Sequence, residues 1–246
     1  MIQIPVGNGS VYNVCWIRFF KNYDYQYRHS DIHALQYKIN QTKKQGGSLK
    51  MDYYDEQILQ SRQEEERQKH TTLETGIYVE DDLITFQKVT LPDTRIQMFL
   101  PEQFIPMPDS VKEVKYPSLN APDFIVTSLD STVNFCFNIL PETLEEGDTK
   151  TMSSQFQNAL HNVNPSIRIK ERVNNTATAK GNEMSWFDFK GYALDGQTYN
   201  RMYIIRMRKN VLHGIFNCPP RVKEEWESIV EQCFNSVEET WGGILH

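Results

Sequence analysis

The order of two hydrophobic periods along residues 83–246 constrains the fold of this chain more than any other feature. Short segments with apolar residues at every second position surround one segment with apolar residues at every third or fourth position. A second segment of the latter kind closes the chain. Period two is typical of half-buried strands, and steps of three and four are typical of amphipathic helices. We therefore expect strands, a central helix, more strands and a closing helix.

Both expected helices have clear ends. The closing helix is predicted over Val222–Val237, just after Pro220, because proline suits a first helical turn. Its apolar stripe includes Trp226, which we expect to pack on a sheet. The central helix is predicted over Met152–Val163, and Pro165 ends it.

Eight segments have the composition and period of strands. They are Leu83–Leu91, Arg95–Leu100, Asp123–Leu129, Val133–Ile139, Ile167–Val173, Glu183–Leu194, Thr198–Lys209 and Val211–Cys218. Asp195-Gly196 and Lys209-Asn210 are short turn signals, so the last three strands should form a hairpin meander. The sequence thus predicts one mostly antiparallel sheet flanked by helices, in the α+β class.

The same residues resemble a known fold. The run LPDTRIQMFLPEQF is followed by a polar strand and turn, a helix, the meander MSWFDFKGYALDGQTYNRMYIIRM and the closing FNCPPRVKEEWESIVEQCFNSV. This order resembles the PsbP-like fold of PsbP, the Ran-binding import factors, DcrB and the effector adaptors of type VI secretion. The resemblance covers the C-terminal two-thirds of the chain. It implies an α/β/α sandwich and a non-enzymatic module that binds a partner protein.

The first seventy-five residues lie outside this resemblance. We expect helices over Asp31–Gln45 and Asp52–Lys69, and the polar run Ser61–His70 has no apolar face. The sequence therefore predicts a partly helical extension over residues 1–75, with a polar linker near 61–75, and a domain over residues 76–246. An aromatic arm with Trp16, Phe19, Phe20 and Tyr23 is a further candidate surface of the extension.

Composition excludes some classes of function. Residues 76–246 carry sixteen Lys and Arg against twenty-three Asp and Glu, within a net charge of −6, which argues against a nucleic-acid partner. The four cysteines have no CxxC spacing, and no apolar run is long enough to span a membrane. We expect a cytoplasmic protein with reduced thiols.

The chain lacks the common catalytic and cofactor motifs, including GxGxxG, GxxxxGK[ST], HExxH and GxSxG. We therefore expect no cofactor, no metal and no enzymatic activity. His29 and His33 are four residues apart and could share a metal on a helix, but spacing identifies no third ligand. Glu145, Glu146 and Asp148 are better explained as a solvated turn than as a cation site.

The meander carries aromatic residues in both phases of the pleat, which has two explanations. Either helices cover both faces of the sheet, or one face is a binding surface. In the second case the partner-binding residues would be the aromatic and basic side chains of the meander, namely Trp186, Phe189, Tyr192, Tyr199, Tyr203, Arg201 and Arg206. Arg208 and Lys209 would extend their basic patch toward an acidic partner segment.

Two functional hypotheses follow. The first is a cytoplasmic adaptor or chaperone, such as one of a bacterial secretion system, that binds an apolar client segment on this sheet face as a monomer or a homodimer. The second is a small-molecule or lipid-binding protein, or an enzyme with a dispersed site, that uses the same cavity. An open groove would favour the first hypothesis, and an enclosed pocket with convergent polar groups would favour the second.

Overall fold

The computed structural model describes residues 3–6, 10–13, 53–116, 121–165, 167–169, 172–193 and 196–240. The chain divides into two compact units, one of residues 24–69 and one of residues 1–23 with 70–246. The described part of the first unit is helix α2 (Tyr53–Lys69), close to the predicted Asp52–Lys69. The second unit holds a hairpin of β1 (Gln3–Val6) and β2 (Ser10–Asn13), and all the other elements. The helix expected over Asp31–Gln45 lies outside the described residues.

An eight-stranded antiparallel sheet forms the centre of the second unit. Its strand order is β11-β13-β14-β15-β10-β9-β8, and β12 also pairs with β13. The strands are β8 (Ile105–Pro106), β9 (Phe124–Thr127), β10 (Asn134–Leu140), β11 (Arg168–Ile169), β12 (Asn174–Ala177), β13 (Glu183–Ala193), β14 (Gly196–Arg206) and β15 (Val211–Cys218). The predicted α+β class and the meander β13-β14-β15 are thus confirmed.

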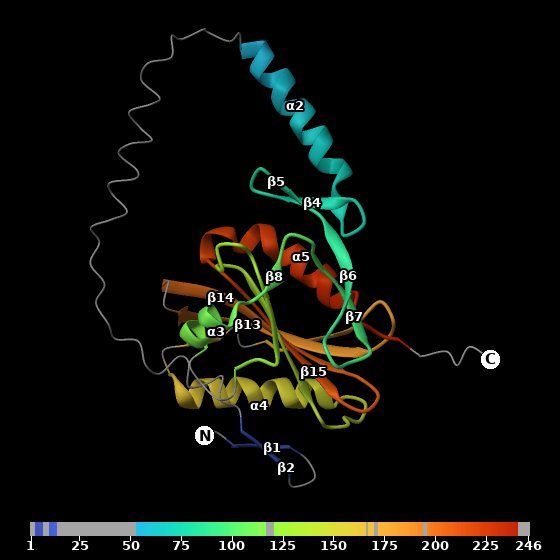
Figure 1. Ribbon diagram of the computed structural model, residues 1–246, viewed down its shortest axis with the longest axis vertical. Helices are drawn as coiled ribbons and strands as arrows, with labels where there is room; N and C mark the ends of the chain where they lie inside the picture. The colour runs from blue at the N-terminus through green and yellow to red at the C-terminus, as the bar shows by residue number, and fades with distance from the viewer. Residues whose placement is uncertain are drawn as a thin grey trace, which may run out of the picture. The chain divides into compact units, whose positions relative to one another are not determined.

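Each face of this sheet is covered (Figure 1). Helix α4 (Asp148–Val163) packs on one face through a cluster that includes Phe156, Leu160 and Phe187. Helix α5 (Lys223–Asn235), preceded by the 3₁₀ turn η2 (Pro220–Val222), packs on the opposite face. We call these the α4 face and the α5 face. Since both faces are covered, a meander with apolar residues in both phases of the pleat is what packing requires.

The N-terminal strands of the domain do not join the main sheet, which corrects the prediction of a single sheet from Leu83 to Cys218. Three strands form one small sheet, β3 (Thr71–Thr72), β4 (Gly76–Val79) and β5 (Asp82–Ile84). A second small sheet has the order β16-β7-β6, from β6 (Phe86–Thr90), β7 (Ile96–Pro101) and β16 (Glu238–Glu239). Its residues Met98 and Leu100 pack in the α5-face core. The sequence also did not predict the short helix α3 (Asp109–Lys115).

The small sheets also move the domain boundary. We predicted it between Thr71 and Gly76, but Thr71 pairs with Ile77 and Leu73 is buried in the α5-face core. These contacts place residues 71–75 with the domain, whose compact unit begins at His70. The polar helix before it has the solvated character expected of Ser61–His70.

A glycine lets α5 lie close to the sheet. A Cβ atom at Gly214, in the central strand β15, would be 2.3 Å from the ring of Phe234, which is far inside van der Waals contact. The ring of Phe234 instead stacks on Tyr203 from β14, with centroids 3.9 Å apart. Close packing of this kind fixes the position of α5 against the meander.

Candidate functional site

The structure places most of the predicted partner-binding residues in the core. Phe189, Tyr199, Arg201 and Tyr203 are at most 2 % exposed, and Trp186 is half-buried. The side chain of Tyr192 lies outside the described residues. Since four of the seven side chains are inaccessible, an exposed aromatic face is not present on the described meander. The aromatic pattern therefore reflects a sheet with two covered faces.

The predicted basic patch is dispersed as well. Arg201 is buried, while Arg206 is half-buried and has its Nε 3.6 Å from Glu183 Oε2. Arg208 and Lys209 are exposed at the far end of the hairpin between β14 and β15. These cations do not form one surface.

A buried ion network occupies the α5 face instead. Arg201 Nε donates to Asp188 Oδ1 at 2.7 Å, and Arg201 Nη2 donates to Glu227 Oε1 at 2.5 Å. The Tyr199 hydroxyl donates to the same Asp188 oxygen at 2.8 Å. The guanidinium carbon of Arg201 lies 4.0 Å from the ring centroid of Trp186, a cation–π contact. Asp188 and Arg201 are directly opposite each other in the pairing of β13 with β14.

The network keeps its members in defined charge states. Burial disfavours the charged form of Arg201, but the hydrogen bond to Asp188 and the electrostatic interactions with Tyr203, Tyr199 and Asp188 together outweigh it and raise the pKa of the guanidinium. Burial also raises the pKa of Tyr199, so its hydroxyl stays protonated and donates. Glu227 is partly buried, yet the hydrogen bond from Lys223 and the charge of Arg201 lower its pKa. The described members of the network are therefore two cations, Arg201 and Lys223, and two carboxylates, Asp188 and Glu227, whose charges balance.

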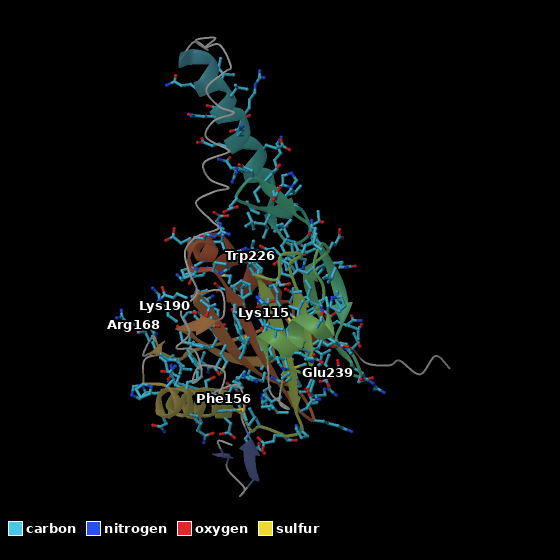
Figure 2. The ribbon with its side chains drawn as sticks, turned by 60° about the vertical axis from the view of Figure 1, so that its left-hand side comes forward. Lys115, Phe156, Arg168, Lys190, Trp226 and Glu239 are labelled. Atoms are coloured by element: carbon cyan, nitrogen blue, oxygen red, sulfur yellow. The ribbon has the colours of Figure 1, made fainter. Side chains whose placement is uncertain are left out.

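A half-open groove of about 640 Å³ lies next to this network, where β11 and β13 meet the start of α5. We call it the basic groove. Four cations line it, Arg168 of β11, Lys190 of β13, Arg221 of η2 and Lys223 of α5. Asp188, Tyr199 and Glu224 also contribute to its lining. Figure 2 shows Arg168 and Lys190 at one edge of the domain.

Two of these cations oppose each other directly. Arg168 and Lys190 are partners in the antiparallel pairing of β11 with β13, and both side chains are exposed. Like charges directly opposite each other destabilise a sheet. This arrangement therefore costs folding free energy, and a bound anion would offset that cost.

This geometry predicts a stabilising substitution. Arg168→Glu should raise the free energy of unfolding by about 0.2–1 kcal/mol, because it places opposite charges across the two strands. Urea denaturation of the wild type and the variant measures the change, and Arg168→Gln, which only removes the repulsion, should give a smaller gain. A loss of stability in R168E would show that Arg168 has a favourable role in the fold.

A second, larger groove of about 900 Å³ has a balanced charge. It lies at the other end of the domain and includes Arg95, Arg208, Lys209, Asp93, Asp123 and Glu239. Backbone groups donate to two of its three carboxylates, since Ile139 N–H donates to Asp123 at 3.0 Å and Arg208 N–H donates to Glu239 at 3.3 Å. The described lining of this groove does not select for one ligand charge.

The other reactive side chains are placed for packing. Burial raises the pKa of the Cys136 and Cys218 thiols to about 12 and also raises that of Cys233, so these three remain protonated thiols at neutral pH. Among the described residues, no group of three or more His, Cys, Asp or Glu could hold a metal ion. The predicted pair His29 and His33, and the aromatic arm from Trp16 to Tyr23, lie outside that part of the chain.

The acidic turn before α4 is held by its own hydrogen bonds. Glu145 N–H donates to Asp148 Oδ2 at 3.2 Å, and Glu145 and Glu146 are exposed. This geometry agrees with the solvated turn that the sequence favoured. None of the helices described in the structure is long and apolar enough to cross a membrane.

A buried histidine makes the stability of the domain depend on pH. His213 of β15 stacks on Phe156 of α4 with centroids 4.8 Å apart, and its Nε2 has no hydrogen-bond partner among the described residues. Burial lowers its pKa to about 4. Between pH 6.5 and about pH 4, His213 is therefore protonated in the unfolded chain but neutral in the folded domain.

The free energy of unfolding should consequently fall as pH drops from 6.5 to 4, by about 1.4 kcal/mol per pH unit and about 3 kcal/mol in total. Urea denaturation at pH 7 and pH 4.5 measures the difference. His213→Gln removes the titrating group and should reduce the difference by about 2–3 kcal/mol, whereas replacement of the exposed His161 by Gln should not. Equal pH dependence of wild type and H213Q would contradict the assignment.

Sequence reasoning did not predict the ion pair of Asp188 with Arg201 or the opposed cations Arg168 and Lys190, because both depend on strand register. A turn centred on Asp195-Gly196 would pair Leu194 with Gln197, but Ala193 pairs with Gly196, whose φ is 115°. Only the observed register places Asp188 opposite Arg201. The pairing of Arg168 with Lys190 joins β11 to β13, with β12 between them in the sequence, and no local signal in the sequence indicates it.

The described domain is an α+β protein whose antiparallel sheet is covered by helices on both faces. No protein-family model matches the sequence, and no curated protein matches it. Solved structures do match over the domain. PsbP of the cyanobacterium Synechocystis sp. PCC 6803 is similar over 63 % of this chain and 92 % of its own, with 11 % identity and a TM-score of 0.48. The element order of the sequence resembles the fold of this same protein.

Two other matches have similar extent. A protein of Bacteroides thetaiotaomicron matches 64 % of this chain and 49 % of its own, with 12 % identity and a TM-score of 0.40. A Pseudomonas aeruginosa protein described as a putative regulator of unknown function matches 63 % of this chain and 98 % of its own, with 11 % identity and a TM-score of 0.38. At these identities and TM-scores the matches carry no argument about activity or partner.

Proposed function

We propose that the protein is a non-enzymatic binding protein, an adaptor or chaperone, that holds a segment of a partner protein in the basic groove. The observation that carries the proposal is the pair of directly opposed, exposed cations Arg168 and Lys190 on the wall of that groove. Their mutual repulsion lowers the stability of the folded domain. An anionic partner would relieve this repulsion, and the relief would contribute to the binding free energy. The half-open form of the groove favours a chain segment over an enclosed ligand.

The rest of the described domain supports a binding role over a catalytic one. The three described thiols are buried and protonated, and His213 is buried and neutral at physiological pH. Two carboxylates at the groove, Asp188 and Glu227, are ion-paired with Arg201, and a third, Glu224, is exposed to solvent. A general base needs a free acceptor atom that is held within reach of the substrate, whereas Asp188 and Glu227 are engaged with Arg201 and Glu224 is solvated.

Capture of native partners by charge-reversed protein tests the proposal. The double variant R168E/K190E removes the opposed cations, and R95E/K209E makes the same change in net charge at exposed residues of the other groove. Each tagged protein is expressed in the native cell, and the co-purified proteins are quantified by mass spectrometry alongside the melting curve of the bait. We expect partners that R95E/K209E retains and R168E/K190E loses at unchanged stability. Equal capture by both variants would refute the proposal.

A small anionic ligand is a second candidate, because a groove of about 640 Å³ lies in the size range of small-molecule sites. The same experiment separates the two, since a small-ligand protein would give identical co-purified proteins for both variants.

A further inference from the structure

We infer that the partner segment is an extended, acidic stretch of polypeptide, whose carboxylates contact Arg168 and Lys190 on the sheet side and the start of α5 on the other. This inference rests on the proposed function and names the chemistry of the partner. The charges around the basic groove carry it.

The described lining of the groove has an excess of positive charge. Lys223 donates to Glu227 at 2.8 Å, and together with Arg201 and Asp188 these residues form the neutral network. Outside that network, three cations of the groove remain against one carboxylate, Glu224. Arg221 has only a long contact of 3.9 Å to Glu80, and both side chains are mostly exposed. Arg168 and Lys190 have no carboxylate partner among the described residues.

This local charge stands out in an acidic protein. The chain has a net charge of −6, and residues 76–246 carry sixteen Lys and Arg against twenty-three Asp and Glu, whereas the described lining of the groove has four cations and two carboxylates. Charge complementarity of this kind selects acidic partners and speeds their association, and salt screens it.

The arrangement of the cations fits a chain segment better than a single small anion. The cations come from three elements, β11, β13 and η2, and Arg168, Lys190 and Arg221 are all exposed, so they do not enclose a buried point. Their heads are exposed, as in Arg221, whose side chain is 71 % exposed. A small anion is bound tightly when several donors converge on it in a desolvated pocket, whereas spaced, solvated cations match carboxylates that are spaced along a peptide.

Tyr199 in the wall of the groove is not itself a contact surface. Lys223 Nζ lies 5.2 Å from the ring centroid of Tyr199, whose hydroxyl is already engaged with Asp188. The side chain is only 2 % exposed, so neither its ring nor its hydroxyl is available to a partner. Recognition of the segment therefore depends on the exposed cations.

The test uses the full-length protein and a fluorescein-labelled octapeptide of alternating Glu and Ala, with fluorescence anisotropy as the readout. The control peptide has Gln in place of Glu. We expect the Glu peptide to bind at least about tenfold more tightly than the Gln peptide, and its affinity to fall as salt rises from about 50 to 200 mM. R168E/K190E should lose this binding at least about tenfold, and the matched control R95E/K209E should keep it within about twofold.

Three results would overturn the inference, namely equal binding of the Glu and Gln peptides, retained binding by R168E/K190E, or loss in both double variants. Inorganic phosphate is added as the small anion. If it displaces the Glu peptide no better than chloride of equal ionic strength, the peptide assignment holds; if it displaces the peptide at low millimolar concentration, the groove is a small-anion site. Failure of the peptide to bind while R168E/K190E still loses its native partners would refute the acidic segment and leave the proposed function intact.

Discussion

Replacing Trp226 with alanine should lower the free energy of unfolding by about 3–5 kcal/mol, the usual cost of deleting a large buried aromatic side chain. Trp226 is 4 % exposed and joins α5 to the sheet and to the loop before β8. Its ring centroid lies 5.6 Å from that of Phe104, 5.7 Å from Phe216 and 6.4 Å from Phe135. Removing it leaves a cavity among these rings that a rigid antiparallel sheet cannot close.

Urea denaturation monitored by circular dichroism measures this change. Glu224→Ala, an exposed position on the same helix, is the matched control and should stay within about 0.5 kcal/mol of the wild type. A loss below about 1 kcal/mol in W226A would mean that α5 contributes little to the domain, in contradiction to its packed face.

Replacing Asp188 with alanine should cost about 3 kcal/mol, because Arg201 would then be a buried cation with one of its two carboxylates missing. The effect lies at the low end of the range for broken buried pairs, since Glu227 still accepts from Arg201 Nη2. The Tyr199 hydroxyl loses its acceptor in the same variant. Chemical denaturation of the purified variant gives the number.

A second variant separates the cost of a broken pair from the cost of losing the residue. The double replacement D188L/R201M removes both buried charges, and we expect it to be more stable than D188A alone, because no charge is left uncompensated. Glu227→Ala should cost less than D188A, since that side chain is 33 % exposed and water can replace it. If D188L/R201M were the less stable of the two, the pair would be net stabilising and the desolvation argument would be wrong.

Local periodicity was sufficient for the elements that form the main sheet and its two helices. β15 has the predicted bounds, β13 and β14 differ by a few residues at their ends, and α4 and α5 lie where their stripes indicated. Burial on two faces also explains the aromatic pattern of the meander. Hydrophobic period determines which segments become strands or helices, and that information is present within each segment.

Pairing between distant segments could not be predicted in the same way. Residues 83–100 have the period of strands, but nothing in that period says that they form two small sheets beside the main one. The basic groove depends on the same kind of information, because Arg168, Lys190 and Lys223 come together only through strand register and the position of α5. In the sequence they are three ordinary cations.

Site-specific photo-crosslinking in the native cell tests the central claim most directly, that the basic groove is where a partner segment binds. A photoreactive amino acid is introduced at Glu224, an exposed residue that lines the groove and is not one of its cations, and in a separate protein at Lys209, an exposed residue outside it. The proposal predicts crosslinks from position 224 to an acidic segment of a partner protein, and their absence from position 209. Crosslinks of equal yield at both positions, or a partner crosslinked only at position 209, would contradict it.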